Sequence, residues 1–129
     1  MSSSLTAAVQ AYLAGDSALT TACPGGVWVY PAPDGQTQPF VTIEQSGSNN
    51  EGCGITRATY EVVAVAPAAS VATARTADAR IQALLDGAYP SLTGFTVLGC
   101  RATAEIDGHD EEIAGRWVRL GGEYTLLVE

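Results

Sequence analysis

The sequence predicts an α+β fold: a mostly antiparallel sheet of about four or five strands, with two helices packed on one face. Two segments carry apolar residues at the helical spacing of about 3.6, and the segments between and after them alternate with the strand period of two. The length of 129 residues is usual for one domain that buries its own core. We therefore expect a single domain over residues 1–129.

The first helix is expected to begin after Ser4, which is a favourable N-cap residue. Its apolar stripe consists of Leu5, Ala8, Val9, Tyr12 and Leu13. Gly15 is expected to end this helix, and residues 16–22 to add a further helical turn. The Cys-Pro-Gly-Gly stretch at 23–26 then stops helical structure.

Two short strands are expected at residues 27–30 and 40–45, joined as a hairpin by a loop that contains Pro31, Pro33 and Pro39. Because proline has no backbone N–H to donate, this loop cannot extend a sheet and must lie at an edge. A stiff loop of this kind also suits an assembly interface, since preorganised backbone loses less entropy on association. The three prolines are therefore candidate interface residues.

The segment that follows, residues 46–54, reads SGSNNEGCG and has no apolar periodicity. We expect it to be a mobile loop. It is either an ordinary structural loop or a contact loop that becomes ordered on assembly, with Asn49 and Asn50 as the candidate contact residues.

A long strand is expected at residues 55–66, closed by Pro67, and strands at 95–106 and 116–128 complete the sheet. The side chains expected to face inward are Ala58, Tyr60, Val62 and Ala64 in the first, Leu98, Cys100, Ala102, Ala104 and Ile106 in the second, and Val118, Leu120, Tyr124, Leu126 and Val128 in the third. Alternation of this kind is typical of a sheet with one buried face.

The second helix is expected over residues 70–86, with Gly87 as its C-cap. Its apolar stripe consists of Ala74, Ala77, Ile81, Leu84 and Leu85. Arg75, Asp78 and Gln82 are expected on the opposite side. Such a stripe is typical of a helix that lies on a sheet.

An arginine is followed four residues later by a glutamate in all three long strands. The pairs are Arg57 and Glu61, Arg101 and Glu105, and Arg119 and Glu123. Positions four apart on a strand share a face, so antiparallel neighbours can pair opposite charges, each pair contributing about 0.2–1 kcal/mol. This face is either an ordinary solvated surface or one that meets another subunit, where arginine–carboxylate pairs fix the register.

Composition excludes several classes of protein. A net charge of −8, with six arginines and no lysine, argues against a surface that grips nucleic acid. Three widely spaced cysteines without a C-x-x-C pair argue against a disulfide framework or a zinc ribbon. No apolar run approaches the roughly 20 residues of a membrane span, and the N-terminus lacks the basic start of a signal peptide. We expect a soluble protein of the reducing cytoplasm, without membrane, cofactor or metal.

Catalysis has little support. The only histidine, His109, lies in DGHDEEIAG at residues 107–115, beside Asp110, Glu111 and Glu112, which are possible cation ligands or acid–base groups. Their spacing matches no metal motif, and no nucleophile or phosphate-loop motif occurs. The sequence therefore predicts no enzyme and no catalytic residue. A small-molecule binding domain or enzyme with a site near His109 stays as a distant alternative.

The order of segments resembles the tail terminator, or tail completion, family of long-tailed bacteriophages. The resemblance lies in a VWVYP strand that enters a proline loop, the stretch PFVTIEQSGS, the strand TRATYEVVAVA, the helix ARTADARIQALLDG and the closing strand RWVRLGGEYTLLV. It covers nearly the whole chain, and its specificity lies in the order and spacing of the segments.

This resemblance implies a structural role in the virion. Family members form a hexameric ring at the head-proximal end of the tail tube, end tube growth and join the tail to the head. The implied partners are copies of the chain, the tail tube protein and a head completion or stopper protein, while DNA passes through the lumen without specific binding. The implied location is the neck of the virion, after assembly in the host cytoplasm.

Another neck component, such as a head–tail connector or stopper, is the closest alternative. The candidate subunit or partner interface consists of Pro31, Pro33, Pro39, Asn49, Asn50, Arg57, Glu61, Arg101, Glu105, His109, Arg119 and Glu123.

Overall fold

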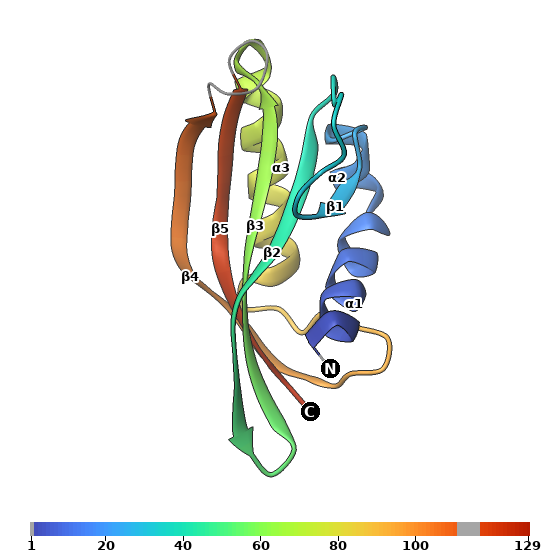
Figure 1. Cartoon of the computed structure of the whole chain (residues 1–129), viewed down its shortest axis with the longest axis vertical. Helices are drawn as coiled ribbons and strands as arrows, with labels where there is room; N and C mark the ends of the chain where they lie inside the picture. Colours follow the sequence, from blue (N-terminus) through green and yellow to red (C-terminus); the bar gives the residue numbers. More distant parts are fainter. Residues whose placement is uncertain (1, 111–116) are drawn as a thin grey trace.

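A computed structural model describes residues 2–110 and 117–129 (Figure 1). The elements are α1 (Ser2–Ala14), α2 (Ser17–Ala22), β1 (Val27–Val29), β2 (Phe40–Gly52), β3 (Ile55–Pro67), the 3-10 turn η1 (Ala68–Ser70), α3 (Val71–Leu85), β4 (Val97–Asp110) and β5 (Trp117–Val128). The sheet order is β1-β2-β3-β5-β4. The pairs β2–β3, β3–β5 and β4–β5 are antiparallel. The predicted α+β class, with a mostly antiparallel sheet, is confirmed.

The main core lies between the helices and the inner face of the sheet. Apolar side chains that are almost fully enclosed come from α1, from α3 and from alternate positions of β3 and β5. They include Leu5, Val9, Leu13, Ala77, Ile81, Leu85, Tyr60, Val62, Tyr124 and Leu126. The predicted helical stripes and the predicted inward faces of these two strands are therefore confirmed. Asp16 caps α2, and Gly87 follows α3 with a φ of 71°.

The first helix begins earlier than expected. It starts at Ser2, so Ser4 lies within α1 and is not its N-cap. Three consecutive serines at 2–4 offer the same capping group at successive positions, so the residue type alone does not define where the helix starts.

The predicted hairpin between the first two strands is wrong, because β1 and β2 run parallel. Val27 lies opposite Val41, and Val29 lies opposite Ile43. The proline loop, residues 30–39, carries the chain back along the sheet before β2 starts, which a tight hairpin turn does not do. A loop of this length permits either strand direction, and the apolar pattern of two short strands is the same in either case, so the sequence does not define the direction.

Residues 46–54 are not an irregular loop. β2 continues to Gly52 and β3 starts at Ile55, so the two strands form a long hairpin that projects beyond the body at the lower end of Figure 1. Cys53 and Gly54 both have positive φ, 55° and 77°, as a two-residue type I′ turn requires. Pairing of the backbone maintains these strands although their side chains are exposed, so apolar alternation could not reveal them.

Two bulges change the face of side chains in β4. The register against β5 shifts between Val97 and Gly99 and between Ala102 and Ala104. Leu98 and Ala104, which were expected to face inward, are exposed, and Ile106 packs against a second cluster on the outer face. Each bulge inserts one residue and reverses the alternation beyond it, so a strict period of two predicts the wrong face.

Candidate assembly surfaces

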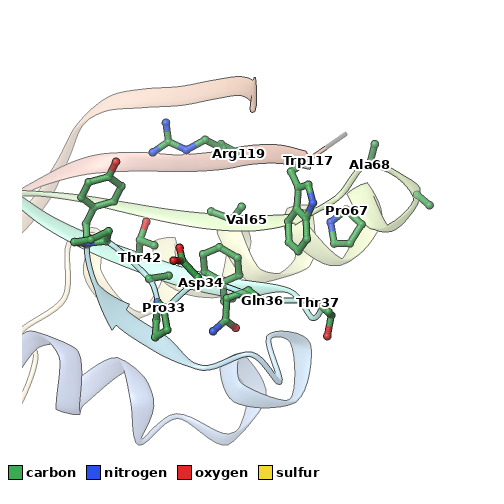
Figure 2. A pocket seen from close by; sticks show the side chains of 16 residues that line it. Pro33, Asp34, Gln36, Thr37, Thr42, Val65, Pro67, Ala68, Trp117 and Arg119 are labelled. Carbon is green, nitrogen blue, oxygen red and sulfur yellow. The ribbon is translucent and has the colours of Figure 1, made fainter. Parts of the chain in front are cut away.

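An open groove of about 960 Å³ lies between the proline loop and the outer face of the sheet (Figure 2). Phe40, Val65 and Trp117 supply apolar lining from three strands. Asp34 contributes a carboxylate from the loop, and Arg119 a guanidinium from β5. The groove therefore combines an apolar floor with one charge of each sign.

The apolar lining belongs to a small second core. Val63 joins Phe40, Val65 and Trp117 in a buried cluster on the face opposite the helices. The rings of Phe40 and Trp117 are 5.8 Å apart between centroids and inclined by 51°, a favourable tilted arrangement. This end of the sheet is consequently buried on both faces.

Both ends of the proline loop are held in place. The Gly25 N–H donates to the carbonyl oxygen of Pro39 at 2.8 Å, and the Tyr30 N–H donates to that of Ile43 at 2.8 Å. A Cβ on Gly25 would lie 2.7 Å from the Pro39 oxygen, so only glycine fits there. Pro31 and Pro33 line the groove and are exposed. An exposed loop with anchored ends is a preorganised surface.

The second surface is the projecting hairpin, which we call the arm and define as residues 46–57. Its side chains are exposed, apart from the half-buried Ile55 and Thr56. Local contacts stiffen its end: Asn50 Oδ1 accepts the Gly52 N–H at 2.8 Å, and Arg57 Nη2 lies 2.9 Å from Glu51 Oε1. β1 pairs with only Val41–Ile43 of β2, so no strand among the described residues covers the outer edge of the arm.

The predicted cross-strand arginine–glutamate pairs are wrong. Glu61 lies directly opposite Glu123 and also opposite Glu44, which places three carboxylates side by side on the outer face. Within the described residues the ion pairs are Arg57–Glu51 and Arg80–Asp16. The register follows the apolar inner face, because a slip by one residue would expose that whole face, and surface charges are too weak to oppose it.

A bulge separates the two residues of the second repeated pair, Arg101 and Glu105. Arg101 lies opposite Thr125 on the outer face, and the shift after Ala102 places Glu105 opposite Gly122, toward the α3 side. Asp78 of α3, which was expected to face away from the sheet, is half-buried and has an enclosed Oδ1. Burial, together with the charge of Glu105, raises the pKa of the Asp78 carboxyl.

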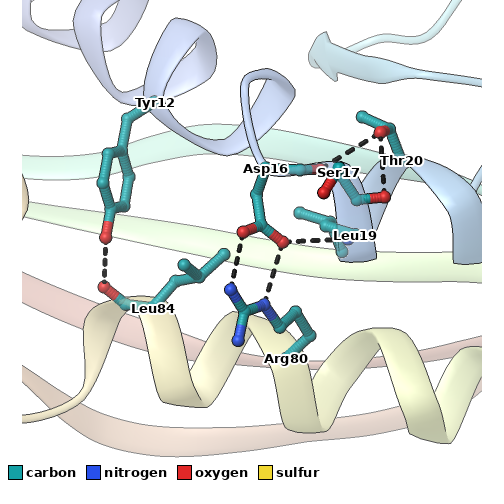
Figure 3. Close-up of polar contacts among 7 residues, drawn as sticks. All are labelled: Tyr12, Asp16, Ser17, Leu19, Thr20, Arg80 and Leu84. Carbon is teal, nitrogen blue, oxygen red and sulfur yellow. Dashed lines mark hydrogen bonds and ion pairs between the residues drawn. The ribbon is translucent and has the colours of Figure 1, made fainter.

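A structural contact that sequence reasoning missed joins the start of α2 to α3 (Figure 3). Arg80 of α3 donates two hydrogen bonds to Asp16, from Nε to Oδ2 at 2.9 Å and from Nη2 to Oδ1 at 2.6 Å. The same carboxylate accepts the Leu19 N–H at 2.9 Å as the cap of α2. The hydrogen bond from Arg80 is the main cause that lowers the pKa of Asp16. A capping motif could have identified Asp16, but not a partner 64 residues away.

The remaining candidates carry no recognisable reactive site. His109 lies in β4 opposite Val118, and residues 111–116 of the charged segment lie outside the described residues. In the described ranges, no three His, Cys, Asp or Glu side chains are grouped to hold a metal ion. Burial raises the pKa of the Cys23 thiol to about 11 and that of Cys100 to about 12, whereas Cys53 is exposed on the arm.

No helix in the described part of the chain is long and apolar enough to cross a membrane. This finding concerns only the helices that the structure describes.

Comparison with known proteins identifies a family whose model matches this chain. The family model described as "Tail completion protein gp17" matches residues 7–121. A chain in the solved structure "Virion of native gene transfer agent (GTA) particle" is similar in fold, with a TM-score of 0.66 and 20% sequence identity over 99% of this chain and 97% of that one. No curated protein matches the sequence.

Proposed function

We propose a function from one premise: the chain belongs to the tail completion protein gp17 family. It is accordingly a structural component of a virion tail and not an enzyme. The proposal is that residues 1–129 act as a single tail terminator domain, of which six copies form a ring. This ring ends growth of the tail tube at its head-proximal end and joins the tail to the head.

The observation that carries this proposal is the preorganised proline loop. Pro31 and Pro33 are exposed beside the groove, while backbone hydrogen bonds anchor both ends of the loop. Ordering a loop during association opposes binding, and each side chain that must be immobilised adds roughly 0.5–1.5 kcal/mol. A surface already ordered in the single chain avoids part of that penalty, which suits a subunit that must add in one defined orientation.

The charge of the chain supports a passage for DNA. Each copy carries a net charge of −8, and Glu44, Glu61 and Glu123 lie abreast on the outer sheet face. Assembled copies of such a chain would repel phosphate, so DNA could move past them without being retained. The proposed partners are other copies, the tail tube protein and a head completion or stopper protein.

The proline loop provides the test. Replacing Pro31, Pro33 and Pro39 together by alanine is expected to reduce ring formation and the yield of completed particles by at least about tenfold, which corresponds to roughly 1.4 kcal/mol of association free energy. The free energy of unfolding should change much less, because the backbone hydrogen bonds at Gly25 and Tyr30 do not need the proline rings.

Pro24→Ala is the matched control, since Pro24 is also exposed but does not line the groove. Electron microscopy of particles would count completed tails, and urea titration would report folding. Normal completion by the triple variant would contradict the role of the loop. Density for this chain away from the head-proximal end of the tail would contradict the terminator function and favour another neck component.

A further inference from the structure

We propose that the arm of each copy seats in the proline-loop groove of the next copy, with the turn at Cys53 and Gly54 leading. This inference rests on the proposed function, because it requires copies of the chain to assemble. It specifies which surface of one copy meets which surface of another.

The arm is a regular hairpin, but few of its side chains pack against the rest of the chain. A two-stranded hairpin alone is at best marginally stable in water, and most of this one is exposed on both faces. Its turn with positive φ and the backbone pairing of β2 with β3 maintain its shape with little apolar burial. An element of this kind obtains burial when a partner covers it.

The groove offers that cover. Its volume of about 960 Å³ lies at the upper end of the range of roughly 300–1,000 Å³ in which pockets enclose their ligands. The floor formed by Phe40, Val65 and Trp117 is apolar but already buried within the chain. The apolar surface that the groove presents to a partner comes from Tyr30, which is 54% exposed, and from the exposed Pro31 and Pro33. Ile55, the apolar residue that follows the turn, and Cys53 are the parts of the arm suited to this exposed apolar lining.

A chain cannot fill its own groove with its own arm. β2 starts at the groove with Phe40 and ends at the arm with Gly52, so its 13 residues separate the two sites by about 40 Å at roughly 3.3 Å per residue. Two different surfaces at opposite ends of one molecule form a head-to-tail contact, and such contacts close into rings when the rotation permits. The arm can therefore enter this groove only in a second copy, which is the occupant that we assign.

Each of the two surfaces carries one charge of either sign, so opposite charges can pair across the contact. The groove carries Arg119 and Asp34, and neither belongs to an ion pair within residues 2–110 and 117–129. The arm carries Glu51 and Arg57, whose mutual contact is exposed and hence weak. On docking, Glu51 would meet Arg119, and Arg57 would meet Asp34, in a less hydrated setting where each pair is stronger.

A native cysteine permits a direct test. Cys53 is at the tip of the arm, while Cys23 and Cys100 are buried. In full-length Gln36→Cys protein, which carries a new thiol in the groove, mild oxidation should yield disulfide-linked ladders on non-reducing gels, with peptide mapping to positions 36 and 53. Ala83→Cys, on the exposed side of α3, is the matched control and should crosslink at least about tenfold less.

A charge exchange adds a second readout. In the Gln36→Cys background, Arg119→Glu should lower the crosslink yield about tenfold, and adding Glu51→Arg should restore it. Loss of the ladder in Gln36→Cys/Cys53→Ser would show that the arm thiol supplies the bond.

The outcomes separate the inference from the proposed function. If native mass spectrometry finds rings of the wild-type chain, but Gln36→Cys crosslinks no more than Ala83→Cys, the arm does not enter the groove and the ring proposal stands. If the wild-type chain forms no ring, either free or at the end of the tail in the particle, both are wrong. Restoration by the charge exchange is the result expected if both hold.

Discussion

The strands β2 and β3 contain two regions that belong to one hydrogen-bonded ladder but differ in the burial of their side chains. Near the groove, residues 40–43 and 62–66 are buried on both faces of the sheet. In the arm, residues 46–54 are exposed on both faces. The register runs through both regions, with shifts only after Gln45 and Asn50.

The comparison teaches that strand pairing and stability come from different sources in this molecule. Backbone hydrogen bonds and a turn with positive φ are sufficient to continue the strands, but apolar burial supplies most of the free energy of folding. The buried region therefore stabilises the chain. We expect the exposed region to contribute little to folding, which leaves its surface available for another molecule.

The largest expected effect lies in the buried region. Ile43 of β2 is fully enclosed, so Ile43→Ala should lower the free energy of unfolding by about 2–5 kcal/mol through lost burial and a residual cavity. Urea titration followed by circular dichroism would measure it. A change below about 1 kcal/mol would remove the distinction between the two regions.

An intermediate effect is expected where the helices meet. Asp16→Ala removes the cap of α2 and the partner of Arg80, and should lower the free energy of unfolding by about 0.5–2 kcal/mol. Asp16→Asn retains a capping oxygen but removes the charge, so its difference from wild type measures the contribution of the charge. Denaturant titrations at a series of pH values would measure both variants.

The pH dependence has a defined sign. Since Arg80 lowers the pKa of Asp16 in the folded chain, the ionised carboxylate stabilises folding above its unfolded value of about 3.9, and this contribution is lost as the pH falls through the lower folded value. The difference between wild type and Asp16→Asn should thus be complete at neutral pH and decrease below about pH 4. A difference independent of pH would contradict the ionic contribution.

The smallest effect on folding is expected in the arm. Asn49→Ala replaces an exposed side chain whose position pairs with Arg57 through the backbone only, so the free energy of unfolding should change by no more than about 0.5 kcal/mol. The same urea titration would measure it beside Ile43→Ala. Destabilisation by more than about 1 kcal/mol would mean that the arm supports the body and is not a free surface.

Several features of the fold follow from local patterns. The stripes of α1 and α3 and the inward residues of β3 and β5 were predictable because each element has one apolar side against one core. The turn at Gly87 was predictable as well, since glycine tolerates positive φ. The groove residues Pro31, Pro33 and Arg119 were among the candidates, but the volume they enclose was not foreseen.

Other features lack a local signal. The bulges of β4 expose Leu98 and Ala104 and turn Glu105 toward Asp78, and no spacing in the sequence marks where one residue is added. The carboxylates of Glu61 and Glu123 come together because the apolar faces set the register. Arg80 forms its hydrogen bonds with Asp16 only when α2 and α3 pack together.

The sequence by itself determined the class of fold, the helices, the buried faces of the central strands and the resemblance to tail completion proteins. These depend on periodicity and order, which are local properties of the chain. Only the tertiary structure decided the direction of β1, the extension of β2 and β3 into an arm, and the groove under the proline loop. The physical reason is that the pairing of strands, and the path of the loop between them, depend on residues far apart in the sequence. A polar strand exposed to solvent also has no apolar alternation from which it could be predicted.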